Sequence, residues 1–497
     1  MFHFATAGHS AYSDPPQRLC PRGRHFGLAP SDSMSADAAQ FRPSPSASRR
    51  PRDPAQGAGP VPRPAAVKAA LVAVGAGLGV SVGLALTAET RAGFAAPGGA
   101  ATFLGSFTGL VGTYLALVMV LLVSRIPFVE RVLGQDGLLR WHRGLAPWPI
   151  SLLIAHAIFL TVGYAQAARS GIWHEAGVVI GQYPDVLIAT VALGVMCAIG
   201  VVSIRAIRKR LPRERWWLIH LFMYLALALS YAHVIALGPS FVRHPLTQVV
   251  WALVWIATAG VVLGYRFGLP IIRTLRHQLE VVEVRPEGPG VVSVILRGRQ
   301  LERLPVSGGQ FLFWRFLTPG MWWQAHPYSL SALPRPPHLR LTVKNVGDHS
   351  GSLARLRPGT RVAIEGPYGA FTRHAQQQPR ALLIAGGIGV TALRSLLEDL
   401  PKRSAPAVIV RASTEADLVL RQEIGELVRH KRGELHEIVG GRDRARLDER
   451  TLARMVPDIV ERDVYICGPE AFVADLVQMV TYLGVANESI HHEAFAL

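Results

Sequence analysis

Four histidines in apolar stretches are the residues best placed to do chemistry. His142 and His156 lie 14 residues apart, and His220 and His233 lie 13 apart, each pair on one apolar stretch. Ionisable side chains inside a membrane are costly, which favours a function for them. At a rise of about 1.5 Å per residue, each pair spans roughly 20 Å of helix. Neutral imidazoles that face each other can supply both axial ligands of a haem iron. The sequence therefore predicts two metal-ligating pairs, His142 with His220 and His156 with His233.

The alternative interpretation is that these are polar core histidines bonded to neighbouring helices. Two matched pairs on alternate helices favour ligation. A spacing of 13 residues leaves an angular offset near 140° at about 100° per residue, so we expect the fifth helix to bend or the two haems to be rotated. His174 and His244 fall in outer loops, where we expect solvated surface histidines.

The elements that must position these histidines are six apolar runs of roughly membrane-spanning length. The loops after the second and fourth runs hold ten Lys and Arg residues, against three after the first, third and fifth. This bias predicts that both termini are cytoplasmic and that runs three and five point the same way. The runs lie near Val67–Ala88, Phe103–Val123, Leu145–Tyr164, Val186–Ile204, Trp216–Leu237 and Gln248–Tyr265.

Composition agrees with a membrane protein that carries a substantial soluble part. Half of the 497 residues are apolar, only 17% are charged and the mean hydropathy is +0.27. The net charge is +18, with its largest excess among the apolar runs, which favours anchoring to anionic lipid over binding nucleic acid. Three cysteines exclude a disulfide scaffold, a zinc cluster and a four-cysteine iron–sulfur centre within the chain.

Four parts are expected along the chain. Residues 1–66 are rich in Pro, Ser, Ala and Arg, which predicts a disordered cytoplasmic tail whose start is Met1 or Met34. Residues 67–271 form a six-helix membrane domain. Residues 272–375 form a small β-domain, with strands at Val281–Val284, Val291–Leu296 and Leu339–Val343 and a turn at Pro286–Gly290. Residues 376–497 alternate strands such as Ala381–Ala385 and Ala407–Val410 with helices, which is typical of an α/β nucleotide-binding domain.

Two segments of the β-domain carry groups suited to a flavin nucleotide. In the first, hydroxyls beside a tyrosine ring suit the edge and face of a flavin. The residues of this segment are His326, Pro327, Tyr328, Ser329 and Ser331. In the second, a cation, a glycine and a hydroxyl suit a pyrophosphate: Lys344, Gly347 and Ser350. Taken separately, each segment is equally an ordinary strand and turn.

Two further turns suit a pyridine nucleotide. An apolar strand leads through Gly386, Gly387 and Gly389 to Thr391 and a helix, and glycines let backbone N–H groups approach a phosphate. This is not a strict G-x-G-x-x-G fingerprint. A second strand ends in Cys467, Gly468 and Pro469, where Cys467 is a buried hydrophobe or flanks a nicotinamide.

In this order, the segments over about residues 100–497 resemble the ferric reductase and NADPH oxidase superfamily. The resemblance implies two haem b groups held by the paired histidines of the third and fifth of six helices. It implies a ferredoxin–NADP-reductase-type module, with a β-barrel FAD domain in which the segment from His326 binds FAD. The glycine turn would then bind the nucleotide pyrophosphate, and the turn at Cys467 would lie by the nicotinamide. Phe495 resembles the C-terminal aromatic residue that shields the flavin, so Ser329, Cys467 and Phe495 are the expected catalytic residues.

The function expected from this resemblance is transmembrane electron transfer, from cytosolic NAD(P)H through FAD and two haem b groups to an outside acceptor. Ferric iron and molecular oxygen are both candidate acceptors, and the plasma membrane is the expected location. Arg411, Ser413 and Arg421 follow the second strand of the nucleotide domain and favour NADPH over NADH. The alternatives are a cytochrome b-type electron-donor subunit and a transporter with a nucleotide-sensing domain; the sequence leaves the oligomeric state open.

Overall fold

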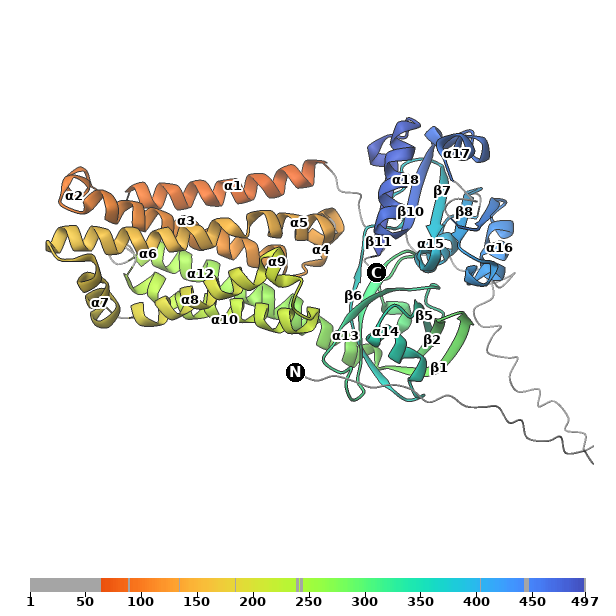
Figure 1. Cartoon of the computed structure of the whole chain (residues 1–497), viewed down its shortest axis with the longest axis horizontal. Helices are drawn as coiled ribbons and strands as arrows, with labels where there is room; N and C mark the ends of the chain where they lie inside the picture. The colour runs from red at the N-terminus through yellow and green to blue at the C-terminus, as the bar shows by residue number, and fades with distance from the viewer. Residues whose placement is uncertain are drawn as a thin grey trace, which may run out of the picture. The chain divides into compact units, whose positions relative to one another are not determined.

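The computed structural model describes residues 64–87, 90–133, 135–183, 185–237, 241, 245–402, 404–441 and 447–495. Figure 1 shows these residues as helices and strands coloured along the chain. Of the predicted tail, residues 1–63 with Met34 lie outside the described residues, as does His244 in its predicted outer loop.

Among the described residues, six helical segments are long and apolar enough to cross a membrane, which confirms the six predicted runs. The third begins at Gly137 rather than Leu145, because only Ala146 separates two successive helices. The sixth continues to His277, through a π-helical segment, beyond the predicted end at Tyr265. The helices that make up these spans are α1 (Pro64–Thr87), α3 (Gly99–Leu122), α5 (Gln135–Leu145), α6 (Pro147–Ala168), α8 (Val186–Ser203), α10 (Arg213–Leu237), α12 (Pro245–Val261), η3 (Val262–Gly268) and α13 (Leu269–His277). Helices between the spans are α2 (Arg91–Ala95), α4 (Pro127–Leu133), α7 (Ile172–Gln182) and α9 (Arg205–Arg208).

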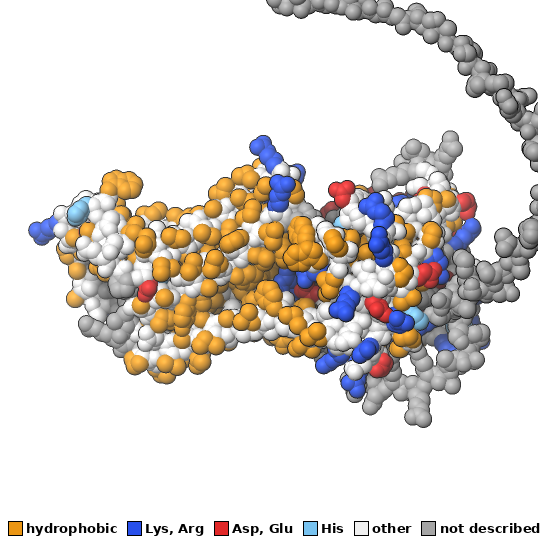
Figure 2. All heavy atoms as spheres, turned by 90° about the horizontal axis from the view of Figure 1, so that it is seen from below, with side chains coloured by type: hydrophobic (Ala, Val, Ile, Leu, Met, Phe, Trp, Pro, Cys, Tyr) orange, Lys and Arg blue, Asp and Glu red, His pale blue; other side chains and the backbone are white. Residues whose placement is uncertain are grey.

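Glycines on α3 allow α6 to pack closely against it. A Cβ added at Gly105 would lie 2.7 Å from Cδ2 of Leu160, and one at Gly109 would lie 2.4 Å from Nδ1 of His156. Neither approach tolerates a side chain, so these glycines let the two backbones come together as small residues do in membrane bundles. Hydrophobic side chains cover the helical part in Figure 2, and charged side chains gather over the remainder.

After the helices comes a six-stranded sheet in the order β4-β3-β6-β1-β2-β5, with antiparallel neighbours. The predicted turn at Pro286–Gly290 is wrong in its extent. β1 continues to Gly288, with an irregular register after Pro286, which has no N–H to give to a ladder. The edge strands approach each other at an isolated bridge between Leu330 and Leu341, and closure into a barrel stays a prediction. The elements are β1 (Leu279–Gly288), β2 (Val291–Arg297), β3 (Phe311–Phe316), β4 (His326–Ser329), β5 (His338–Lys344), α14 (Asp348–Ser352) and β6 (Arg361–Tyr368).

The C-terminal part is a five-stranded sheet in the order β11-β10-β7-β8-β9, with parallel neighbours. Apolar clusters cover both of its faces, as a parallel sheet requires. The predicted alternation of strands and helices is confirmed. Its elements are β7 (Arg380–Gly386), α15 (Val390–Asp399), β8 (Ala407–Ala412), α16 (Arg421–His430), β9 (Glu434–Val439), α17 (Glu449–Met455), β10 (Arg462–Pro469), α18 (Glu470–Tyr482) and β11 (Ile490–Phe495).

Candidate functional site

The structure brings the four predicted histidines together in the two predicted pairs. The rings of His142 on α5 and His220 on α10 lie 6.2 Å apart between centroids, at an interplanar angle of 74°. The rings of His156 on α6 and His233 on α10 lie 6.1 Å apart, at 70°. α10 runs as one α-helix through both of its histidines. Whether a bend of this helix or a rotation of the two haems accommodates the 13-residue spacing stays a prediction.

Hydrogen bonds orient one imidazole of each pair. Nδ1 of His142 lies 3.2 Å from the carbonyl oxygen of Met119, and Nδ1 of His156 lies 2.8 Å from that of Gly105. Because a carbonyl oxygen only accepts, each Nδ1 must donate. In a neutral ring Nε2 then carries the lone pair, so Nε2 is the atom that could coordinate a metal. Nδ1 of His220 and of His233 is buried and meets no hydrogen-bond partner among the described residues.

The donor set fits a pair of axial imidazole ligands. Two metal–nitrogen bonds of about 2 Å each, added to the two ring half-widths, place ring centres about 6 Å apart. Both observed separations match this value. Among the described residues no group of three or more His, Cys, Asp or Glu side chains gathers as a metal cage. What the helices offer is two-imidazole ligation, which suits a metal whose other ligands come from a macrocycle.

An aromatic ring and a guanidinium stack behind one of the histidines. The Trp216 ring lies 4.9 Å from the His220 ring at 23°, and the guanidinium of Arg208 lies above that indole, 4.4 Å from its centroid. Nε1 of Trp216 donates to Oγ of Ser203 at 3.2 Å. Sequence reasoning missed this stack. The available signal was the four-residue spacing of Trp216 and His220, which puts them on one helix face.

In the six-stranded sheet, Ser329 and Tyr328 lie on β4 with polar groups suited to a ligand. Ser329 is buried, and its Oγ meets no partner among the described residues. An orphaned buried hydroxyl calls for an explanation, and a bound flavin edge supplies one. The Tyr328 hydroxyl lies 3.0 Å from Nδ1 of His349, whose ring stacks on that of His326 with centroids 3.6 Å apart. Burial lowers the pKa of His349 to about 4, so this imidazole is neutral at pH 7 and can accept from the phenol. Sequence reasoning missed His349.

Other members of the two predicted FAD segments are engaged within the protein. Ser331 is fully buried, and its Oγ accepts from Nε of Arg340 at 3.1 Å and from Oγ1 of Thr342 at 2.8 Å. These bonds occupy the Ser331 hydroxyl within the protein. Pro327, on β4, is exposed.

The second predicted segment forms a turn and the five-residue helix α14. Oγ of Ser350 accepts from the backbone N–H of Val346 and donates to the carbonyl of Gly347, both at 3.0 Å. Nζ of Lys344 lies 3.6 Å from Oδ1 of Asp417. The hydroxyl is thus used within the turn, and the half-exposed ammonium is the group of this segment that stays accessible.

The glycine turn joins β7 to α15, as predicted. Gly387 has a φ of +54°, in the region that favours glycine, and a Cβ at Gly389 would lie 2.3 Å from the carbonyl oxygen of Cys467. Oγ1 of Thr391 donates to the carbonyl of Ile388 at 3.0 Å. The turn is therefore held against the end of β10, where a phosphate can approach backbone N–H groups at the start of α15.

The carboxyl ends of β7, β10 and β11 meet at one edge of the parallel sheet. Cys467 pairs with Ala385 on one side and Glu493 on the other, and Pro469 pairs with Phe495. Burial and the neighbouring Glu493 carboxylate raise the pKa of the Cys467 thiol, so it is neutral. Ligands of open α/β sheets bind at such an edge, which favours a nucleotide there.

The two sheets approach each other close to this edge. A Cβ at Gly369, just after β6, would lie 3.3 Å from the Phe311 ring and 3.8 Å from Oε2 of Glu493. Phe311 pairs with Ser329 in the β3–β4 ladder. Ser329 is thus connected to Cys467 through Phe311, Gly369 and Glu493, so the two residues lie in one region of the fold. Glu493 was missed from the sequence, although its strand register with Cys467 follows once β11 is known.

The residues proposed for a 2′-phosphate lie near the end of β8. Arg411 is half-buried, with Nη1 donating to the carbonyl of Gly440 at 3.3 Å, and Ser413 is exposed. Arg421 is exposed at the start of α16 and pairs with Glu415 and Glu437 at 2.9 and 2.5 Å. Two carboxylates already compensate Arg421, so Arg411 is the freer cation of the two.

A buried charge cluster joins the helices to the six-stranded sheet. Glu365 on β6 accepts from Arg125, which follows α3, and from Arg266 in the π-helical segment at 3.0 Å. The Arg125 guanidinium also lies 4.2 Å above the Phe313 ring. Burial raises the pKa of the nearby Glu130 carboxyl to about 7. Arg125 and Glu365 are 240 residues apart, and sequence reasoning had no local signal for this contact.

Three family models match the chain in the order that the fold suggests. They are the ferric reductase like transmembrane component over residues 108–231, the FAD-binding domain over 277–372, and the oxidoreductase NAD-binding domain over 383–478. The chain belongs to the ferric reductase and NADPH oxidase superfamily by this domain architecture. It is a multi-pass membrane protein joined to an FAD- and NAD(P)H-binding oxidoreductase module.

Curated relatives match the soluble part of this ferric reductase-like chain. A flavohemoprotein of Bacillus subtilis is 27% identical over 42% of the chain and 56% of its own length. A flavohemoprotein of Bordetella pertussis is 31% identical over 44% of the chain and 60% of its own length. Ferredoxin–NADP reductase B of Sorangium cellulosum is 28% identical over 45% of the chain and its full length. The chain thus spans little more than half of each flavohemoprotein.

Proposed function

We propose that this protein oxidises cytosolic NAD(P)H and passes the electrons across the membrane to an acceptor on the other side. The observation that carries the proposal is the pair of imidazole couples, at 6.2 and 6.1 Å, in a chain whose soluble part binds FAD and NAD(P)H. Each NAD(P)H loses two electrons and one proton. Two one-electron acceptors, such as ferric ions or oxygen molecules, each gain one electron.

The groups implied are FAD, NADPH and two haem b groups. His142 with His220 would hold one haem, and His156 with His233 the other. When bound, these groups supply the redox chemistry: nicotinamide gives up a hydride, flavin takes its two electrons, and haem irons take electrons singly. The Nδ1 donors of His142 and His156 fix the orientation of their rings for that task.

The residues of the soluble part would bind and orient the two nucleotides. The unpartnered Ser329 hydroxyl would donate to the flavin edge, beside the Tyr328 ring. The glycine turn from Gly386 would take the nucleotide pyrophosphate, and Arg411 the 2′-phosphate of NADPH. A neutral Cys467, together with Phe495, which packs against the apolar cluster that contains Cys467, would give the nicotinamide an apolar, water-excluding surface.

Two observations that agree support the orientation in the membrane that we propose. The six-stranded sheet is bonded to Arg125 and Arg266, so it lies on the side of the loop after the second span. That loop belongs to the arginine-rich set, which the charge bias assigns to the cytoplasm. His142 precedes His156 along a span that starts on this side. We therefore place His142 and His220 nearer the nucleotide module, and His156 and His233 nearer the acceptor.

A visible spectrum of the purified full chain tests the proposal. We expect flavin absorbance and the absorbance of two haem b groups, and we expect anaerobic NADPH to reduce both. In sealed vesicles with the nucleotide module outwards, NADPH should then reduce a ferric chelate trapped in the lumen. A preparation that binds flavin but never haem would overturn the transmembrane step and leave a soluble-type NAD(P)H reductase on a membrane anchor.

A further inference from the structure

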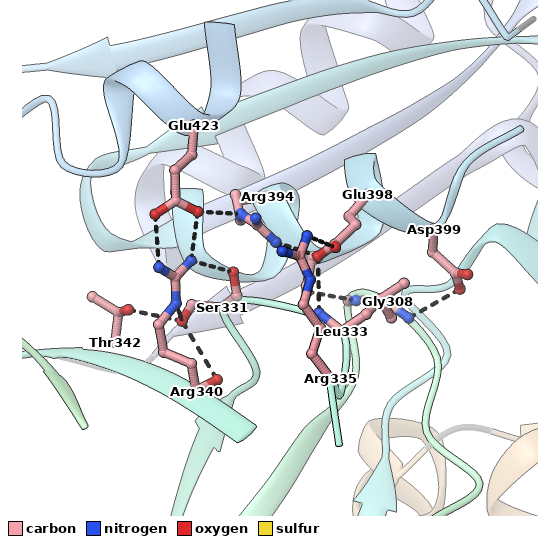
Figure 3. A network of polar contacts seen from close by, with 12 residues as sticks. Gly308, Ser331, Leu333, Arg335, Arg340, Thr342, Arg394, Glu398, Asp399 and Glu423 are labelled. Carbon is pink, nitrogen blue, oxygen red and sulfur yellow. Dashed lines mark hydrogen bonds and ion pairs between the residues drawn. The ribbon is translucent and has the colours of Figure 1, made fainter. Parts of the chain in front are cut away.

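A buried ion network joins the six-stranded sheet to the parallel sheet, and Figure 3 shows it in close view. Arg340 on β5 and Arg394 on α15 are fully buried side chains, and both bond Glu423 on α16. Nη1 and Nη2 of Arg340 donate to the two Glu423 oxygens at 2.7 and 2.8 Å. Nε of Arg394 donates to Oε2 of Glu423 at 2.9 Å.

The same network continues along α15. Arg394 also donates to Glu398, one helical turn later, and Glu398 accepts from Arg335 at 2.7 Å and from the backbone N–H of Leu333 at 3.0 Å. Burial alone would raise the pKa of the Glu398 carboxyl, but Arg394 and Arg335 hold it at about 2. Both carboxylates of the network are thus ionised at pH 7, since Arg340 and Arg394 also lower the pKa of Glu423.

Two backbone contacts extend the bonded face of α15. The N–H of Gly308 donates to Oδ2 of Asp399 at 3.0 Å, and the N–H of Gly309 donates to Oγ of Ser395 at 2.9 Å. A Cβ at Gly308 would lie 2.2 Å from the carbonyl oxygen of Ser395, so the loop lies directly on the helix. One face of α15, with side chains three and four residues apart, is therefore fastened to the six-stranded sheet.

Each end of this network reaches a segment assigned to a cofactor. Arg340 donates to the hydroxyl of Ser331 at 3.1 Å and to its carbonyl at 3.2 Å, so it fixes the end of the segment from His326. Arg394 lies on α15 five residues after Gly389, on the helix that starts at the glycine turn. Bonds therefore run without interruption from the proposed FAD segment, through Glu423, to the helix whose start would hold the pyrophosphate.

We propose that Arg340, Glu423, Arg394 and Glu398 are positioning residues that set the nicotinamide against the flavin by fixing α15 to the FAD segment. The proposal rests on the nucleotide roles given above. Stability alone does not explain the network, because buried ion pairs are often no more stabilising than apolar residues of similar size. A guanidinium group has five N–H donors in a rigid planar arrangement, so the buried arginines can fix the geometry between the six-stranded sheet and the parallel sheet.

The decisive variant removes the central charges together and refills their volume, in the full chain purified with its cofactors. Arg340→Met, Arg394→Met and Glu423→Leu leave Glu398 paired with Arg335, so no carboxylate is stranded. We expect a melting temperature, an FAD content and an NADP⁺ affinity close to the unmodified protein. The anaerobic rate of flavin bleaching at saturating NADPH should fall about tenfold or more, because small misplacements of reacting atoms are costly. Bleaching by dithionite should not change.

A second readout does not depend on turnover. Binding of NADP⁺ next to a flavin perturbs the flavin absorbance spectrum, and this perturbation should shrink in the triple variant at saturating NADP⁺. The matched control is Glu280→Leu with Arg297→Met, an exposed ion pair on the same sheet, which should keep both the rate and the spectral perturbation. Should the triple variant fail to accumulate, Glu423→Gln, which keeps the side-chain shape, should show the same changes in smaller degree.

The outcomes separate this proposal from the proposed function. An unmodified protein that NADPH cannot bleach contradicts the function, while the NADP⁺ spectrum still tests the network. A triple variant with unmodified bleaching rate and unmodified NADP⁺ spectrum overturns the positioning role. So does a variant whose losses follow its melting temperature and FAD content, with an unchanged rate per bound flavin.

Discussion

The arginine network of the soluble half and the second histidine of each pair in the helical half are opposite cases of buried polar groups. In the soluble half, Arg340 and Arg394 are fully buried, and each finds two or more partners within the protein. In the helical half, His220 and His233 bury Nδ1 without a hydrogen bond to any described residue. Buried polar groups are usually paired, so the first arrangement is complete as it stands and the second is arranged for something the chain does not itself provide.

This contrast indicates that the helical half, more than the soluble half, depends on a bound metal group to hold its buried side chains in place. The soluble half can hold its geometry through protein contacts, with ligands added at the rim of a preformed sheet edge. The helical half holds the two imidazoles of each pair 6.2 and 6.1 Å apart, at steep angles, and one ring of each pair has no hydrogen bond at Nδ1 from a described residue. A metal ion between the rings would bond both of them. Replacing one histidine should therefore abolish electron transfer across the membrane, whereas replacing one residue of the soluble half should reduce its binding or rate only in part.

The strongest way to break this contrast is to remove one ligand from each pair. His233→Leu should remove the outer haem, keep flavin reduction by NADPH, and leave the remaining haem able to accept an electron. Reduction of a membrane-impermeant ferric acceptor should fall to background. His220→Leu should also keep flavin reduction, but the outer haem should stay oxidised on the same timescale.

These variants also test the assigned direction. Full haem content and full transmembrane activity in both would contradict the four-histidine scheme. If His233→Leu blocks reduction of all haem while His220→Leu does not, the two pairs are inverted relative to the nucleotide module.

The next largest effect is expected in the FAD segment. Tyr328→Ala with Ser329→Ala removes the buried phenol and the unpartnered hydroxyl, and should give haem-loaded but flavin-poor protein. The ratio of flavin to haem absorbance in the purified protein measures this. The matched control is Ser352→Ala at the end of α14, whose hydroxyl donates to the carbonyl of Asp348 in the same helix, and it should keep the ratio. Full flavin occupancy in the double variant would remove these residues from the FAD site.

Sequence reasoning succeeded where the signal is local or periodic. Span length and spacing were enough to pair His142 with His220, and strand–turn–helix order located the glycine turn at Gly386. The third span begins earlier and the sixth ends later than predicted, because α5 and α13 are helical through polar residues, where hydropathy falls but backbone hydrogen bonding does not.

Contacts between distant segments could not be predicted in this way. Glu365 meets Arg125 across 240 residues, and Arg340 meets Glu423 across 83. Ser331 belonged to a plausible FAD motif, yet its hydroxyl bonds Arg340, a partner visible only when β5 is placed. A sequence motif indicates which residue types are present. Only the folded structure shows which of their hydrogen-bonding groups are already used within the protein.

A smaller expected effect tests the glycine face of α3. Gly109→Ala places a Cβ at 2.4 Å from Nδ1 of His156, so the ring must move away from its carbonyl partner. We expect loss or broadening of the outer haem signal while the inner haem is kept. Gly194→Ala on α8 is the control, because its Cβ meets no described atom within 4 Å. Unchanged haem spectra in Gly109→Ala would show that His156 needs no support from α3.

The nucleotide preference should respond more modestly. Arg411→Ala should raise the KM for NADPH with little change for NADH, since a charge-assisted hydrogen bond is worth about 1.5–3 kcal/mol. Arg421→Ala should have the lesser effect, because Glu415 and Glu437 already hold that guanidinium. Steady-state kinetics with both nucleotides check this. Equal effects on NADPH and NADH would contradict recognition of a 2′-phosphate by these arginines.

The smallest effect concerns Glu130, the buried carboxyl next to the Arg125–Glu365 pair. Burial raises its pKa from 4.5 to about 7, so between these values the folded protein holds a proton that the unfolded chain has lost. The stability that this group contributes is fully present below about pH 4.5, is lost as pH rises through that window, and changes no further well above pH 7. Glu130→Gln keeps the neutral form, and should flatten the fall in melting temperature between about pH 5 and about pH 8 by a few degrees. Glu302→Gln, an exposed carboxyl on the six-stranded sheet side, is the control and should keep the slope of the unmodified protein. If Glu130→Gln keeps that slope as well, the carboxyl is charged in the folded state, and the junction between the helices and the sheet holds a second acidic partner for its arginines.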